Sequence, residues 1–393
     1  MPEVHARLSA SGAHKWLNCP MSLWMEDEIP EPESSYAAEG TKAHTLAEIT
    51  LKYEVLKTMT LEAYTKEREK LEPVDAEMQE HVQSFVDYVK ERFASARQRT
   101  KDAILLSEAR LDYSCWAPEG FGTGDVVIIA DGYMEIIDLK YGKGVVVYAQ
   151  DNPQLKLYAL GAVSEYEMLY DVDEVYVTIF QPRLDHISSQ LYTVEELEDW
   201  GYNSVIPGAK KALRGEGRCT PGEHCDKGFC RARPICRAYA EQNLSVAKFD
   251  YAHPQTLTPS EISSILEHVD QLTRWAKMVK DYALDQMLHG KEIPGFKAVE
   301  GRSNRSYSSE KEVLAALIEA GKDPVDFSTT KPLGITEMEK KLGKKTFDEL
   351  LGGLIIKPAG SPTLVPATDK RPAINSEEAA ANDFKEFIDK GDR

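Results

Sequence analysis

The sequence lacks an apolar run long enough to cross a membrane. A spanning helix needs about 20 apolar residues, whereas the longest runs here, such as Val126–Ala130 and Val145–Ala149, have the length of strands. The first residues, Met1–Arg7, contain no apolar stretch typical of a secretory signal. We therefore expect a protein without membrane contact that works in the cytoplasm.

An overall excess of positive charge is also missing. The 393 residues include 47 Lys and Arg against 65 Asp and Glu, which gives a net charge of −18. This balance argues against a protein that coats nucleic acid over its whole surface. It does not exclude a nuclease, because a nuclease needs only one positive groove and carboxylates for a metal ion.

Cysteine is scarce, but its distribution is uneven. Four of the six cysteines fall between Cys219 and Cys236, in a stretch where Lys and Arg outnumber Asp and Glu. The six are Cys19, Cys115, Cys219, Cys225, Cys230 and Cys236. In a chain without a secretory signal, such crowding favours metal or cluster ligation over disulfide bonds.

Hydrophobic periodicity predicts an α/β fold with a mixed sheet flanked by helices. Helices are expected within residues 1–57, over 75–98 and over 153–167; strands are expected at 103–113, 125–130, 133–139, 174–181 and 187–192. Asp131-Gly132 is typical of the tight turn of a hairpin between two of these strands.

The pattern divides the chain into three parts. Residues 1–245 form the α/β core and end in the cysteine segment. Residues 255–372 are expected to form a smaller helical or α+β domain, which opens with the capping box Thr258–Glu261. The polar tail, residues 375–393, is expected to be disordered.

The stretch richest in possible chemistry pairs Gly122-Thr123-Gly124-Asp125 with Asp138-Leu139-Lys140. On a strand, Asp138 and Lys140 share one face, and a hairpin partner can place the Asp125 carboxylate beside them. Carboxylate and carbonyl oxygens suit Mg²⁺ or Mn²⁺. A charged hairpin in solvent is the simpler reading, but Asp138 follows two apolar residues, where an unused carboxylate is costly.

These residues resemble the core of the PD-(D/E)XK nuclease superfamily in its RecB-like branch. Two further motifs of that branch are present in the expected order: a histidine in Gly40-Thr41-Lys42-Ala43-His44, and Gln-x-x-x-Tyr from Gln154 to Tyr158. The resemblance implies a restriction-endonuclease-like fold and DNA cleavage that depends on Mg²⁺ or Mn²⁺. Alone, each motif has a simpler explanation: a surface or core histidine, and an ordinary i,i+4 pair.

The resemblance also assigns roles to single residues. The metal ligands would be His44, Asp125, Asp138 and the carbonyl of Leu139. Lys140 would be the catalytic lysine, with Gln154 and Tyr158 supporting the site or holding DNA, and Glu108 as an accessory acid. The leading expectation is an exonuclease that trims DNA ends for recombination.

The cysteines resemble those of the iron–sulfur members of this branch, the AddB-type nucleases and the CRISPR-adaptation exonucleases. The resemblance implies a [4Fe–4S] cluster held by Cys19, Cys225, Cys230 and Cys236. The spacing departs from that family, because four residues rather than two separate Cys225 from Cys230. Cys219 could therefore substitute for one ligand. The main alternative is a local Zn²⁺ site, whose ligands would be Cys219, Cys225, Cys230 and Cys236, with or without His224.

The C-terminal part, with Gly295–Arg305, Thr363–Pro366 and Asp369–Pro372, resembles the phage and prophage family known as domain of unknown function 2800, over nearly the whole chain. This implies a role in phage DNA replication or recombination inside a bacterial host cell. DNA is the expected partner, with a phage single-strand-binding or annealing protein as a candidate second one.

Arg302 and Arg305 are candidate phosphate contacts, and a solvated turn is the alternative. The rival functions are a DNA-binding protein without catalysis and a zinc-stabilised scaffold.

Overall fold

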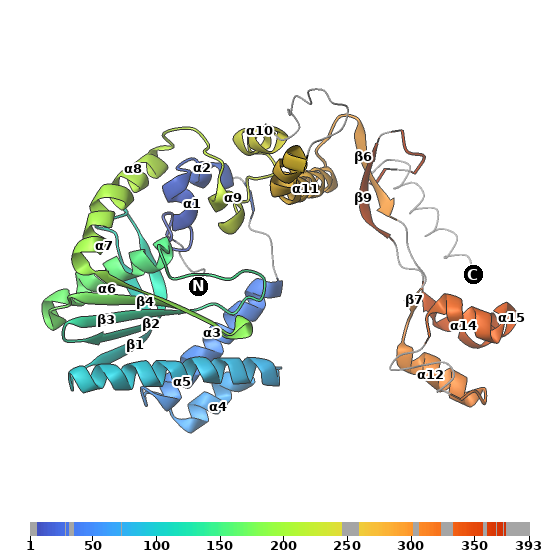
Figure 1. The fold of residues 1–393 in the computed structure, drawn as a ribbon. Helices are drawn as coiled ribbons and strands as arrows, with labels where there is room; N and C mark the ends of the chain where they lie inside the picture. The colour runs from blue at the N-terminus through green and yellow to red at the C-terminus, as the bar shows by residue number, and fades with distance from the viewer. Residues whose placement is uncertain are drawn as a thin grey trace. The chain divides into compact units, whose positions relative to one another are not determined.

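Figure 1 shows the computed structural model of the chain. The structure describes residues 6–27, 29–30, 35–71, 73–245, 259–301, 306–323, 333–356, 360–366, 368–371 and 373–374. The tail 375–393 and the pair Arg302 and Arg305 lie outside these residues. Among the helices described, none is both long and apolar enough to span a membrane.

The chain forms two compact units, Met1–His268 and Val269–Arg393, and the division falls inside helix α11 (Pro259–Leu288). The other helices of the first unit are α1 (Ala13–Asn18), α2 (Ser22–Glu26), α3 (Ser35–Glu54), α4 (Leu61–Glu69), α5 (Ala76–Arg99), α6 (Pro153–Tyr170), α7 (Val194–Trp200), α8 (Ile206–Arg214), α9 (Glu223–Lys227) and α10 (Arg237–Ser245).

The first unit is built on a five-stranded sheet in the order β1-β2-β3-β4-β5. Its strands are β1 (Ile104–Asp112), β2 (Phe121–Ala130), β3 (Tyr133–Leu139), β4 (Glu174–Gln181) and β5 (His186–Thr193). Neighbours are antiparallel except β3 and β4, which are parallel and joined through α6. The predicted mixed α/β fold is therefore confirmed.

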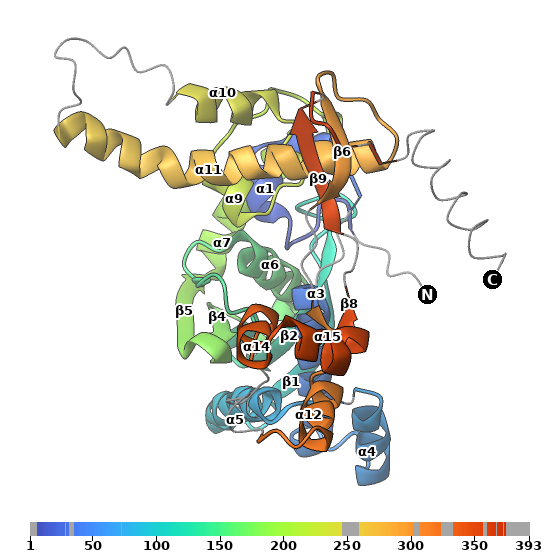
Figure 2. The same ribbon diagram turned by 90° about the vertical axis from the view of Figure 1, so that its right-hand side faces the viewer.

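Helices cover both faces of this sheet (Figure 1, Figure 2). On one face α6 packs with Leu155 and Leu157 into a core that includes Ile129 and Ile136. On the opposite face of the sheet, Val82 and the other apolar residues of the predicted stripe of α5 pack against a second set of strand residues. The alternation of side chains along the strands places the two cores on opposite faces.

The β2–β3 hairpin sets the register that matters most. Ala130 pairs with Tyr133 across a two-residue turn, and Gly132 adopts a φ of 68°, which costs glycine little. The pairing of β2 with β3 extends from this turn to Val126, which lies opposite Ile137. One step further along this register, Asp125 faces Asp138.

The second unit contains short elements. β6 (Phe296–Gly301) pairs with β9 (Gly360–Pro366), and β7 (Ser306–Tyr307) pairs with β8 (Ile355–Ile356). Its other helices are α12 (Glu310–Glu319), α14 (Ile335–Leu342) and α15 (Lys344–Leu351). They enclose a small core of five fully buried side chains: Val313, Leu317, Met338, Phe347 and Leu351.

Candidate functional site

The Asp125 carboxylate is held by residues from two other elements. Its Oδ2 accepts a hydrogen bond of 2.6 Å from the backbone N–H of Leu139, at the end of β3. Its Oδ1 lies 3.0 Å from Nδ1 of His44, in α3. The hairpin register and the packing of α3 therefore bring a predicted histidine and a predicted aspartate together, although 81 positions separate them in the chain.

Asp138, Lys140, Gln154 and Tyr158 form a connected polar network between β3 and α6. The Lys140 ammonium lies 2.9 Å from Oδ2 of Asp138 and donates a hydrogen bond of 3.1 Å to Oε1 of Gln154. The Gln154 amide in turn donates to Oδ1 of Asp138 at 3.2 Å and to the Tyr158 hydroxyl at 3.3 Å. Asp138 is only 4% exposed, so this network replaces the water that its carboxylate has lost.

The structure explains why glycine occupies position 122, three residues before Asp125 in the motif. A Cβ atom at this position would lie 2.6 Å from Cε1 of Tyr158, closer than van der Waals contact allows. Glycine thus lets the Tyr158 ring lie directly against β2. Because Tyr158 also accepts a hydrogen bond from Gln154, the glycine helps to fix the network around Asp138.

Glu108 joins the site from β1, where it lies opposite Asp125 in the strand register. Its φ is 51°, a left-handed conformation that costs a glutamate of the order of 1 kcal/mol or more and that is frequent at functional sites. The ligand atoms of His44, Glu108 and Asp125 all lie within 4.8 Å of one another, so this group could hold a metal ion. The acid predicted as an accessory residue is therefore part of the tightest ligand group among the described residues.

Asp138, another of the predicted metal ligands, is placed beside this group rather than in it. Asp138 is on the neighbouring strand and exerts its charge on His44. The backbone N–H of Leu139 orients Asp125.

The charges in the site favour a cation. Burial, followed by the Asp125 charge, raises the pKa of Glu108 to about 7. Burial raises the pKa of Asp138 as well, against the opposing effect of Lys140. Burial opposes the charged form of His44, but the hydrogen bond to Asp125 and the charges of Asp125 and Asp138 together outweigh it, and the pKa of His44 is raised. Carboxylates crowded into low dielectric repel each other, and a bound cation would relieve that repulsion.

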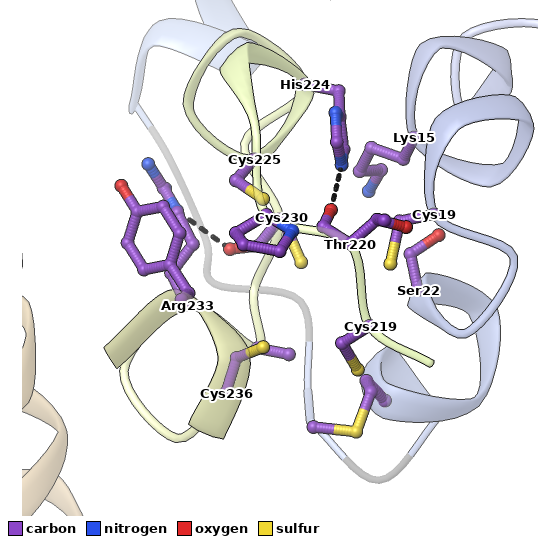
Figure 3. A pocket seen from close by; sticks show the side chains of 14 residues that line it. Lys15, Cys19, Ser22, Cys219, Thr220, His224, Cys225, Cys230, Arg233 and Cys236 are labelled. Carbon is purple, nitrogen blue, oxygen red and sulfur yellow. Dashed lines mark hydrogen bonds between the residues drawn. The ribbon is translucent and has the colours of Figure 1, made fainter. Parts of the chain in front are cut away.

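The cysteine segment forms a second candidate site, which is shown in Figure 3. One cavity is lined by five of the six cysteines: Cys19, Cys219, Cys225, Cys230 and Cys236. His224 also lines it. None of these thiols forms a disulfide, and the sixth, Cys115, is exposed elsewhere. The structure thus brings Cys19 to the trailing cysteines, about two hundred positions away in the chain.

Hydrogen bonds tie the two chain segments together around this cavity, and the buried Glu26 carboxylate is central to them. The Glu26 carboxylate accepts hydrogen bonds from Nζ of Lys15 at 2.7 Å and from the backbone N–H of Arg231 at 2.7 Å. The Thr220 hydroxyl donates to the carbonyl of Asn18 at 2.9 Å. No sequence motif marks Glu26 or Lys15, so sequence reasoning missed these contacts.

Most of the thiols in this cavity resist ionisation. Burial and the neighbouring Cys236 and Cys19 raise the pKa of Cys219 to about 12. Burial and Glu26 raise the pKa of Cys230 to about 11. Burial also acts against ionisation of Cys19, but the interactions with His224 and Thr220 together outweigh it and lower the pKa of Cys19. Metal binding at this cavity would therefore release protons.

Comparison with known proteins places the chain in a family. The family model described as "Protein of unknown function (DUF2800)" matches residues 5–372, and the chain belongs to this family, as its resemblance predicted. A solved structure titled "Crystal structure of SSO0001" shares 12% sequence identity with it, over 56% of this chain and 95% of that chain, with a TM-score of 0.22. A likeness this low supports no inference about activity.

Proposed function

We propose that this protein is a metal-dependent DNA nuclease of the PD-(D/E)XK superfamily, and that it acts as an exonuclease in phage DNA replication or recombination. One observation carries the proposal. The Lys140 ammonium lies 2.9 Å from the buried Asp138 carboxylate, beside the His44–Asp125 pair and linked to Gln154. Residues that a RecB-like nuclease would need, taken from four separate elements, therefore meet in one place.

The donor set fits a hard divalent cation. His44, Glu108 and Asp125 supply one imidazole and two carboxylates, and Oδ2 of Asp138 is a buried oxygen whose partner is the Lys140 ammonium. Mg²⁺ and Mn²⁺ prefer such ligands. When bound, the ion would polarise the scissile phosphate and lower the pKa of a water molecule.

The surroundings of Lys140 favour a charged role for it. Burial opposes its ammonium form, but the adjacent Asp138 carboxylate outweighs burial and raises the pKa of Lys140. A protonated lysine cannot abstract a proton from water. It can donate hydrogen bonds to the phosphate oxygens and stabilise the negative charge that develops during cleavage. Gln154 accepts a hydrogen bond from this ammonium and donates one to Asp138, so it keeps the Lys140 side chain next to that carboxylate.

The cavity with five thiols supports a [4Fe–4S] cluster rather than zinc. In a tetrahedral zinc site with Zn–S bonds of about 2.3 Å, the sulfur atoms lie roughly 3.8 Å apart. Among the described residues, no three cysteines have sulfur atoms that all lie within 4.8 Å of one another. The sulfur atoms are therefore not gathered as one zinc ion would need, although Cys219 interacts with both Cys19 and Cys236. Cys19 gives the cavity a ligand from the N-terminal segment, which the local zinc site does not use.

A cleavage assay tests the proposed function. Single-stranded and double-stranded DNA, labelled at either end, is incubated with the anaerobically purified protein and Mg²⁺, Mn²⁺ or a chelator. The proposal expects metal-dependent shortening from the ends. Binding without cleavage would instead favour the rival function, a DNA-binding protein without catalysis. Zinc without iron or sulfide in the purified protein would favour the zinc-stabilised scaffold.

A further inference from the structure

The second unit carries a concentrated positive charge that the candidate nuclease site does not use. Lys340 and Lys341 end α14, and Lys344 and Lys345 begin α15. Four lysines thus fall within six residues, without an acid among them, in a chain that has 18 more acidic than basic residues. We call these four residues the basic corner.

The fold presents the basic corner at the surface. Gly343 alone joins α14 to α15, with a φ of 79° that only glycine adopts readily. The Gly343 N–H donates to the carbonyl of Glu339, and its own carbonyl accepts from Phe347, both at 2.9 Å. All four lysines of the corner are exposed. The turn therefore brings the ends of two helices, with two lysines each, to one place.

A small rigid core supports this turn. Met338 on α14 and Phe347 on α15 are completely buried, on either side of Gly343. The Tyr307 hydroxyl donates to the carbonyl of Leu333 at 3.1 Å and tethers the chain just before α14. Figure 1 shows α14 and α15 side by side. The positions of the four lysines are thus set by packing rather than by a flexible tail.

A plain solvated surface accounts for Lys340 and Lys341, because they lie in the last turn of α14 and Glu337 precedes Lys341 at i,i+4. It does not account well for the other two lysines. Lys344 and Lys345 occupy the first turn of α15, where the helix dipole disfavours positive charge, and no acid is present in that turn. Asp348 and Glu349 follow them at i,i+4, but a lysine that precedes its acid is the weaker order for a helical pair. The lysines thus cost the helix some stability, which a role in binding would explain.

We infer that the basic corner binds the phosphate backbone of nucleic acid, at a contact separate from the catalytic residues. The inference rests on the proposed nuclease function and deepens it by adding a holding surface for the substrate. Clustered lysines bind phosphates by charge and by release of counterions, without reading sequence. A net charge of −18 would otherwise repel DNA, so a local positive surface is what association requires.

The test measures binding to a labelled 30-mer, single-stranded and double-stranded, in a chelator so that no cleavage occurs. The variant K340Q/K341Q/K344Q/K345Q neutralises the basic corner. The control K66Q/K101Q/K277Q/K280Q removes four exposed lysines elsewhere and changes net charge equally. A third variant replaces the four corner lysines by arginine.

The corner variant should lose at least about tenfold in affinity near 0.1 M salt, and the slope of log Kd against log salt for the duplex should fall by about 3. The control and the arginine variant should stay within about twofold of wild type. Unchanged melting temperatures would show that all variants fold. If the arginine variant loses affinity as well, charge is not the cause and the inference is wrong.

Equal losses in the corner variant and its control would overturn the inference, because total charge would then explain both. A loss confined to vesicles of phosphatidylserine, with DNA binding unchanged, would also overturn it and point to a membrane surface. Binding in a chelator does not depend on cleavage. A wild-type protein that binds DNA through these lysines but never cuts it would refute the nuclease and leave the basic corner standing.

Discussion

The carboxylate site and the thiol cavity both join residues distant in the chain, but the protein holds them in different ways. Asp125 and Asp138 lie on neighbouring central strands, and hydrogen bonds from Leu139 and Gln154 fix their oxygens. The thiols are carried on short elements, such as the five-residue helix α9, and on the loops around them. One site is organised by the fold, and the other has little regular structure to organise it.

This difference predicts what a bound metal does in each place. Where the fold already positions the ligands, the ion contributes chemistry and little folding energy. Where short segments meet around a cavity, ligation contributes to the free energy of folding, as it does in structural zinc sites. Loss of metal should therefore abolish activity at the first site and lower stability at the second.

The largest effect should follow replacement of the lysine in the carboxylate site. Lys140→Met removes the ammonium beside Asp138, and we expect the rate of DNA cleavage to fall about a thousandfold. The melting temperature should change far less than the rate. The matched control is Lys143→Met, because Lys143 is an exposed lysine three positions on that pairs with Glu77. Equal activity in the two variants would contradict the role of Lys140.

The next effect concerns stability at the thiol cavity. Cys19→Ser should lose iron and the brown absorbance, and unfolding should become easier by about 4 kcal/mol, since the ligation closes a very long loop. Cleavage should fall only as a consequence. Cys115→Ser is the control, because this exposed cysteine lies outside the cavity.

The zinc alternative gives the opposite pattern for the same cavity. Its ligands all lie between Cys219 and Cys236, so Cys19→Ser would be nearly silent and Cys219→Ser severe. Metal content and melting temperature of both variants decide between the two. A Cys19→Ser protein with full metal content and a normal melting temperature would rule out the iron–sulfur proposal.

A smaller effect is expected from His44. Because it lies 3.0 Å from Asp125 in the predicted ligand group, His44→Ala should raise the metal concentration for half-maximal cleavage about 10- to 100-fold. Mn²⁺ should rescue activity better than Mg²⁺, since it accepts softer ligands. The exposed His289 supplies the control variant. An equal loss at every metal concentration would indicate a structural histidine instead.

The smallest effect is a pH dependence of stability at the carboxylate site. The pKa of Glu108 is about 7 in the folded protein, against an ordinary value of 4.5. Between these values the unfolded chain has released the proton and the folded protein has kept it, so stability falls as pH rises from 4.5 to 7. Glu108→Gln cannot lose a proton and should escape this loss.

The measurement is thermal unfolding of the metal-free protein at pH 5 and pH 8. The Glu108→Gln variant should gain melting temperature relative to wild type at pH 8 only. Saturating Mg²⁺ should reverse the order, because wild type then keeps a ligand that the variant lacks. An identical pH dependence in both proteins would show that Glu108 does not carry the strained, buried charge.

The hairpin part of the carboxylate site could be predicted because it depends on local rules. Strands 133–139 and 174–181 appear with the predicted bounds, and the Asp131-Gly132 turn fixes the register that places Asp125 beside Asp138. Helix α6 continues three residues beyond the predicted end, to Tyr170. Strand periodicity and turn chemistry act over a few residues, so one sequence is enough to show them.

The parts that escaped prediction depend on contacts between distant segments. No local pattern shows that Glu108 adopts a left-handed conformation, or that Glu26 receives the N–H of Arg231. The sequence also left open whether Cys219 belongs with the other cysteines, and the structure places its thiol in the same cavity. Such relations follow from how helices pack on the sheet, and only the folded structure reveals them.

DNA cleavage is the activity that we propose for the preformed carboxylate site. The most direct measurement compares wild type with Asp138→Asn on end-labelled DNA in Mg²⁺, because asparagine keeps the shape of the side chain and removes its charge. We expect metal-dependent cleavage by wild type, none by the variant and similar DNA affinity for both, with a lower melting temperature for the variant because the Lys140 ammonium loses its partner. Cleavage by Asp138→Asn at the wild-type rate would contradict it.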